Sequence, residues 1–162
     1  MKYFAKWILL GAAMHCISAL AATTTTALPV AATVINICDT LTATSLSFGN
    51  YDPTSHSPTD STNSISVRCT LNDAYTITLN SGTTSGGSVS QRLMTNGTRT
   101  LNYNLYTTSA RTTIWGDGVT GGSVSTSGTG FLQTYTVYGR IPSNQVVPAG
   151  AFSDTITVSV NY

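Results

Sequence analysis

Residues 28–38 read LPVAATVINIC, and this stretch decides how the chain can fold. A period of two in its apolar side chains predicts a β-strand with one apolar face, because successive side chains of a strand point to opposite sides. Pro29 lacks a backbone donor, which favours the end or the edge of a sheet over its centre. The stretch is therefore either the first strand of its own domain or a strand that is lent to a neighbouring molecule. The alternating apolar residues are Leu28, Val30, Ala32 and Val34.

The segment ahead of this stretch has the three parts of a secretory signal peptide, expected at residues 1–21. Two lysines supply positive charge, an apolar run follows, and residues 19–21 read ALA, the small-x-small pattern of a cleavage site. A membrane anchor is the alternative, although the apolar run is short for a bilayer. We expect cleavage to leave an N-terminal extension at 22–37 and a single domain at 38–162.

Charged residues are scarce outside the leader. Both lysines of the chain belong to the leader, no glutamate is present, and five arginines face six aspartates. Because no basic patch can form, we expect neither nucleic acid nor an anionic lipid surface as a partner.

Two cysteines, Cys38 and Cys69, remain once Cys16 leaves with the leader. An even pair in an oxidising compartment predicts a disulfide. Its closed loop of about thirty residues contributes roughly 3–4 kcal/mol by chain entropy. Two free thiols are the alternative, and a metal site is disfavoured because two cysteines without a nearby histidine cluster do not make a ligand set.

The remainder reads as β-structure, since threonine, valine, isoleucine and tyrosine dominate and no helical stripe occurs. Short strands separated by glycine-rich turns predict a β-sandwich or barrel. Alternation is clearest at the C-terminus, where the core face of the last strand carries Ile156, Val158, Val160 and Tyr162. The candidate strands are residues 30–37, 45–48, 64–70, 74–79, 100–107, 112–115, 131–141 and 153–162.

No pattern of residues indicates catalysis, and we expect no enzyme and no small-molecule cofactor. His56 is the one histidine after the leader, and it lies in the polar loop 55–60 beside serine and aspartate. A catalytic triad holds its members across a fold, so His56 is predicted to be a solvated loop residue. Most of the aspartates fall in predicted turns, where Asp bonds its own backbone, rather than in a catalytic pair.

The order and spacing of several segments, taken together, resemble one family. They are the strand before Cys38, then 46–53 (LSFGNYDP), 67–69 (VRC), 101–106 (LNYNLY), 115–118 (WGDG), 138–142 (YGRIP) and 148–155 (PAGAFSDT), which leads into the terminal strand. The chain resembles the spore coat protein U family, which includes the pilins of archaic chaperone–usher pili in Gram-negative bacteria. Phe152 departs from the tyrosine that is more usual there, but keeps the aromatic character.

The resemblance implies an incomplete immunoglobulin-like β-sandwich that lacks one strand. It also implies the partners: a periplasmic chaperone that fills the exposed groove first, an outer-membrane usher, and identical or related pilin subunits whose N-terminal extensions replace the chaperone by β-strand addition. Carried over to this chain, the donor strand corresponds to Leu28, Val30, Ala32 and Val34. The implied function is that of a structural pilus subunit, exported to the periplasm and then to the cell surface, which supports adhesion and biofilm formation.

Three alternatives remain open at this point. The strand at 28–34 could fold back on its own domain and give a monomer, or the protein could be a non-fibrous spore or cyst coat component of the same fold. The third alternative is a secreted carbohydrate-binding sandwich whose stacking aromatic residues would be Tyr103, Tyr106, Trp115, Tyr135 and Tyr138.

Overall fold

A computed structural model describes residues 21–162, so the expected leader lies, except for its last residue, outside the described part. Residues 34–162 form one compact unit, and residues 21–33 belong to a separate one. The segment 21–162 contains no helix that could cross a membrane.

Eight strands build the compact unit, and every ladder between them is antiparallel. The expectation of an all-β chain is therefore confirmed. The strands are β1 (Cys38–Ala43), β2 (Thr59–Cys69), β3 (Ala74–Leu79), β4 (Arg92–Thr95), β5 (Thr100–Tyr106), β6 (Val124–Ser127), β7 (Leu132–Ile141) and β8 (Val158–Asn161).

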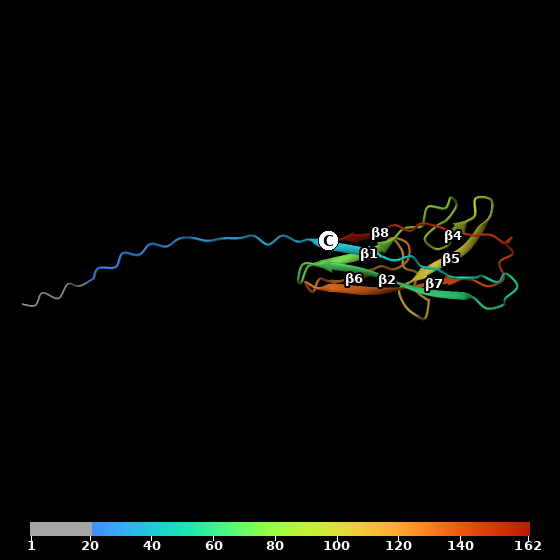
Figure 1. The fold of residues 1–162 in the computed structure, drawn as a ribbon, viewed down its shortest axis with the longest axis horizontal. Coiled ribbons are helices and arrows are strands. Elements are labelled where there is room, and N and C mark those ends of the chain that lie inside the picture. The colour runs from blue at the N-terminus through green and yellow to red at the C-terminus, as the bar shows by residue number, and fades with distance from the viewer. Residues whose placement is uncertain (1–20) are drawn as a thin grey trace, which may run out of the picture. The chain divides into compact units, whose positions relative to one another are not determined.

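The strands form two sheets (Figure 1). One has the order β1-β2-β7-β5-β4 and the other the order β6-β3-β8, and one of the two is curled into a half-barrel. Each sheet turns an apolar face inward, because inward-pointing residues alternate with exposed or half-exposed ones along β2, β3 and β7. The core between the sheets consists of Ile65, Val67, Cys69, Tyr75, Ile77, Leu79, Leu101, Tyr103, Leu105, Trp115, Val137 and Ile141.

The unit has two ends that matter for function (Figure 1). At the disulfide pole, Cys38 and Cys69 are bonded where β1 begins and β2 ends. The turns at 70–73 and 128–131 meet beside them. At the loop pole, the long loops 49–58 and 142–150 are joined, since the Tyr51 hydroxyl donates to the Pro142 carbonyl over 3.1 Å.

Three of the expected strands are corrected by the structure. Residues 30–37 and 45–48 form no ladder, and 112–115 makes only isolated bridges at Ile114 and Trp115. A strand is defined by its partner, and an alternating sequence does not show whether its own chain supplies one. The terminal strand is also shorter than expected, since the ladder covers only Val158–Asn161 and Ser153 makes an isolated bridge to Thr95.

Three observed strands were not expected: β1, β4 and β6. The first reads CDTLTA and the last VSTS, so neither carries an apolar run that predicts a strand. In β4 the inward position is occupied by Arg92, which is fully buried, and a charged residue at a core position conceals the alternation.

Candidate functional site

An apolar groove of about 900 Å³ opens into the core of the compact unit. One wall is residues 43–53 and the other is residues 147–158. Core side chains of both sheets form its floor, among them Ile65, Leu79 and Val137. An open groove of this depth leaves core residues within reach of any apolar segment that can enter it.

The groove lies between the edges of the two sheets. β1 is the outer strand of its sheet, and β8 is the outer strand of the other. Because β8 pairs only with β3, its other side presents backbone N–H and C=O groups without a ladder partner among residues 21–162. Such an edge is a template for adding a strand.

The first wall is attached to its sheet by side-chain hydrogen bonds instead of a backbone ladder. The ladder between β1 and β2 ends at Ala43, after which Asn63 bonds Thr44 and the Ser61 hydroxyl donates to the Ser47 carbonyl over 2.6 Å. Phe48 then lies against β7 at Gly139, where a Cβ atom would stand 2.8 Å from the Phe48 ring. A glycine at this position therefore lets the wall pack its aromatic ring flat on the sheet.

The second wall is extended over its whole length, although it is paired only at Ser153, through an isolated bridge to Thr95, and at its end in β8. From Phe152 to Val160 every second side chain is half-buried and the side chains between them are exposed. Asn80 ties the unpaired part to the second sheet, since its side-chain oxygen accepts from the Thr157 amide at 2.9 Å. This wall already has the conformation that a further antiparallel neighbour requires.

Among the described residues that line the groove, Asp154 is the one that carries a charge. Its carboxylate accepts the Tyr103 hydroxyl at 2.7 Å and the amide groups of Thr83 and Thr84 at 2.9 and 3.0 Å. Partial burial acts to raise the pKa of Asp154, but the hydrogen bonds from Tyr103, Thr155, Thr83 and Thr84 outweigh it and hold that pKa below the ordinary 3.8. The carboxylate thus fastens the second wall to β5 and to the loop after β3.

We expect Asp154→Asn to destabilise the unit by about 1–3 kcal/mol and to reduce the loss of stability in acid. Because the folded pKa is depressed, the stabilisation is present above 3.8 and disappears as the pH falls through the lower folded value. Urea denaturation followed by the fluorescence of buried Trp115, at neutral and acidic pH, measures both effects. Equal acid sensitivity in the variant and the unaltered chain would contradict this role.

Arg92 is buried beneath the groove floor and has 0% exposure. Its guanidinium donates to the carbonyls of Asn80, Leu79 and Trp115 at 2.8–3.1 Å and to Asn104 Oδ1 at 2.7 Å. Burial lowers its pKa, while the charges of Asp154 and Asp117 and the neighbouring Tyr103 oppose that shift. This role could not be predicted from the sequence, because the three backbone carbonyls and the Asn104 side chain that accept its bonds come together only in the fold.

The predicted donor residues are found without a strand partner. Leu28, Val30 and Val34 are 84%, 88% and 85% exposed, and Ala32 is exposed as well. No residue of 21–37 belongs to a strand in the structure.

Of the four residues predicted for the core face of the C-terminal strand, three pack against the core and one is exposed to solvent. Ile156, Val158 and Val160 pack against the core, and the first and second of these also line the groove. Tyr162 is 59% exposed.

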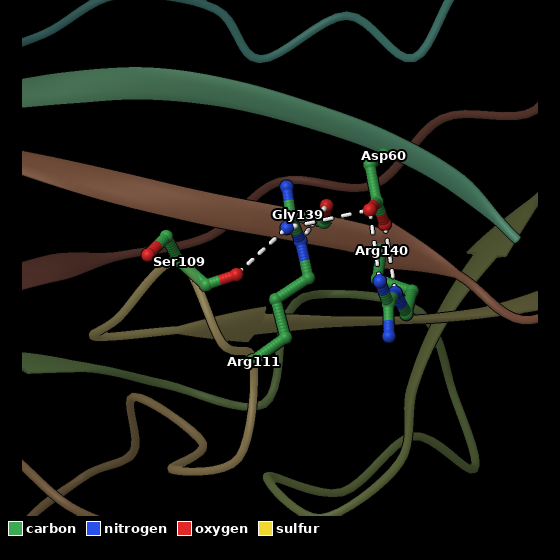
Figure 2. Close-up of polar contacts among 5 residues, drawn as sticks. All are labelled: Asp60, Ser109, Arg111, Gly139 and Arg140. Carbon is green, nitrogen blue, oxygen red and sulfur yellow. Dashed lines mark hydrogen bonds and ion pairs between the residues drawn. The ribbon is translucent and has the colours of Figure 1, made fainter.

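The residues of the polar loop 55–60 do not come together as a reactive group. His56 Nδ1 lies 2.9 Å from Asn144 Oδ1, whereas Asp60 begins β2 and takes two bonds from Arg140. Figure 2 shows Arg111 reaching the same carboxylate, 3.3 Å away, while it also donates to the carbonyls of Ser109 and Gly139. The bond from Arg140, with the charge of Arg111 beside it, lowers the pKa of Asp60, and the cluster serves to fasten the loop before Thr113 to β7.

No group of three metal-ligating side chains occurs among the residues that the structure describes.

The chain was compared with known proteins. Residues 24–159 match the Spore Coat Protein U domain. The curated proteins gave no match. Among solved structures, the chain is similar to the CsuC–CsuE chaperone–tip adhesion subunit pre-assembly complex from the archaic chaperone–usher Csu pili of Acinetobacter baumannii, with 27% sequence identity and a TM-score of 0.55. The match covers 80% of this chain and 40% of the other chain, so this chain spans less than half the length of that one.

These matches confirm the resemblance on which the expected fold was based, and they indicate no enzymatic family. The domain match takes in both walls of the groove and the segment that carries the alternating apolar residues. The chain belongs to the Spore Coat Protein U domain family.

Proposed function

We propose that this protein is a structural subunit of a surface pilus, and that its groove receives the N-terminal strand of another subunit. One observation carries the proposal. The same chain has an apolar groove between two sheet edges and an exposed segment with apolar side chains at every second position. The groove lacks an apolar strand to fill it, and the exposed segment lacks an apolar surface to cover it.

The lengths of the two segments agree. Residues 28–34 span roughly 23 Å as a strand, at about 3.3 Å per residue. The extended second wall from Phe152 to Val160 is slightly longer, so it can pair with all of the donor. Because all ladders of the structure are antiparallel, we place the donor antiparallel to β8, with its alternate side chains on the groove floor.

Burial of apolar surface supplies much of the binding free energy. Burying Leu28, Val30, Ala32 and Val34 contributes very roughly 5–8 kcal/mol before the cost of ordering the extension. Backbone bonds along the open side of β8 add to this and give the contact its direction. A head-to-tail contact of this kind does not close on itself, so repetition generates a fibre.

An open apolar groove beside an unpaired strand edge is also a hazard for the free subunit, since the groove can associate with other apolar strands. We therefore propose that a periplasmic chaperone covers the groove after export and that an outer-membrane usher exchanges the chaperone for the next subunit. The similar solved structure is itself a complex with a chaperone, which supports this order of events. The pilus would then lie on the cell surface and support adhesion and biofilm formation.

The carbohydrate-binding alternative receives less support from the geometry. Trp115 is fully buried and donates to the Ile77 carbonyl, and Tyr103 is buried against Asp154. Tyr135 bonds the hydroxyl of Tyr75, and Tyr138 lies beneath Arg111. Four of the five candidate rings are therefore engaged by other groups, and the fifth, Tyr106, is half-exposed opposite Tyr138 in the ladder between β5 and β7.

The test is a gel of material sheared from cells that express this chain, probed for the protein with and without boiling in denaturant. Strand exchange predicts a ladder of subunit multiples that collapses to one band on boiling, because no covalent bond joins the subunits. A single monomer band in both lanes, from protein shown to be exported, would contradict the proposal and favour a strand that folds back on its own domain.

A further inference from the structure

A small apolar patch surrounds the point where the extension leaves the compact unit. Ile37 and Leu71 are 50% and 61% exposed, and Phe131 is 77% exposed. Ile37 and Gly130 line one shallow hollow at the disulfide pole, together with the ion-paired Asp39 and Arg68. Leu71 lies near Gly130, since a Cβ atom there would stand 4.0 Å from it, and Phe131 directly follows Gly130 in the chain. We call Ile37, Leu71 and Phe131 the root patch.

Thr70 fixes the root of the extension to the unit. Its amide donates to the Ile37 carbonyl at 3.0 Å, and its hydroxyl accepts from the Ile37 amide at 3.1 Å. Ile37 is therefore held on both of its backbone groups, and the Thr70 hydroxyl also lies 3.5 Å from the Ile35 carbonyl.

The sequence places the end of the donor very close to this anchor. Val34 is the last residue on the apolar face of the donor strand. The next apolar residues, Ile35 and Ile37, belong to the opposite face. Only three Cα–Cα steps separate Val34 from Ile37, which span at most about 11 Å. A subunit that holds Val34 in its groove must therefore stand directly over the root patch.

The direction of the donor decides which surface of the neighbour arrives there. β8 runs towards the disulfide pole, because its Asn161 pairs with Thr76 near the start of β3. A donor antiparallel to β8 thus leaves the groove at the loop pole of the neighbour. That pole presents Val146, which is 99% exposed.

The loop that carries Val146 is held firmly enough to form a contact. The side chain of Gln145 both accepts from the Asn102 amide at 2.7 Å and donates to its carbonyl at 2.9 Å. The Gln145 amide in turn donates to the Tyr51 hydroxyl at 3.0 Å.

We propose that the root patch of one subunit packs on the loop pole of the next copy of this chain, with Phe131 against Val146. This second contact rests on the proposed strand exchange and adds to it, because it limits the angle between successive subunits. The short anchored linker and the apolar contact together make the junction stiff, whereas a long free linker would leave it flexible.

The test is a Phe131→Cys, Val146→Cys double variant, assembled into fibres, oxidised and boiled in denaturant without reductant. We expect a covalent ladder that collapses to monomer when reductant is added. Each single variant is expected to give only monomer after boiling, and so is a Phe131→Cys, Val119→Cys pair, because Val119 is equally exposed but lies on the turn after Asp117.

The contradicting result is a double variant whose fibres give the non-covalent ladder before boiling but only monomer after it. This result would overturn the root-patch contact and leave strand exchange standing. Absence of the non-covalent ladder from the unaltered chain would instead refute strand exchange itself. A thiol-free readout is provided by Phe131→Asp, which we expect to polymerise normally but to give fibres of shorter persistence length in electron micrographs. Val119→Asp is its matched control, and equal persistence lengths for the two would also overturn the contact.

Discussion

We expect replacement of Val30 and Val34 with aspartate to abolish the proposed fibre formation while the subunit stays soluble in complex with its chaperone. Both side chains belong to the apolar face of the proposed donor and are exposed in the structure, so the change does not disturb the folded unit. In a neighbour's groove, however, each carboxylate would be buried against core residues without a cationic partner. Such burial costs several kcal/mol for each charge and exceeds the gain from the remaining apolar contacts.

The measurement is the sheared-fibre gel together with co-purification of the subunit and its chaperone. An Ala31→Asp, Thr33→Asp double variant serves as the matched control, because residues 31 and 33 lie on the other face of the same strand and the variant adds the same two charges. We expect the control to keep a ladder and the Val30→Asp, Val34→Asp variant to lose it. A ladder of normal length from the Val30→Asp, Val34→Asp variant would refute the assignment of the donor.

The second large effect is expected from Arg92→Leu, which should lower the free energy of unfolding by about 3–5 kcal/mol. The substitution leaves three backbone carbonyls and the Asn104 side-chain oxygen without their buried donor. Unpaired buried acceptors lose their solvation without compensation, and a loss of this size is a large part of the stability of a domain. The groove floor would loosen where β4, β5 and the Trp115 segment meet.

Urea denaturation followed by Trp115 fluorescence measures this loss. Arg99→Leu removes the same charge from an exposed position and should stay within about 0.5 kcal/mol of the unaltered chain. If the two variants unfold at the same urea concentration, the bonds of Arg92 do not stabilise the fold as argued.

The fold class could be predicted because the alternation of apolar and polar residues in four of the strands indicates which side chains are buried. β3, β5 and β7 lie close to their expected bounds, since inward Val, Ile, Leu and Tyr residues recur there with a period of two. β2 ends near its expected bound but begins five residues earlier, at Thr59 instead of residue 64, because its first half is polar. The disulfide between Cys38 and Cys69 followed from an even pair of cysteines behind an export signal, and the structure contains this bond. These features depend on local pattern and composition.

The groove could not be predicted in the same way, because it depends on which strands have no partner. Residues 45–48 alternate like a strand, yet the structure attaches them to β2 through Ser61 and Asn63. The roles of Asp154 and Arg92 depend on partners such as Tyr103 and Trp115 that are distant in sequence. A sequence pattern shows that a side chain belongs inside, but tertiary contacts decide what it meets there.

The most direct test of the account is whether the groove binds the donor strand as a separate peptide. The subunit is prepared without residues 21–33 of its extension, as the compact unit 34–162 in complex with the chaperone, and is titrated with a labelled peptide of residues 24–37. The account predicts that the peptide binds one to one and displaces the chaperone, and that a peptide with aspartate at positions 30 and 34 does neither. Failure of the unaltered peptide to bind a subunit that remains folded would contradict the claim that this groove accepts a strand.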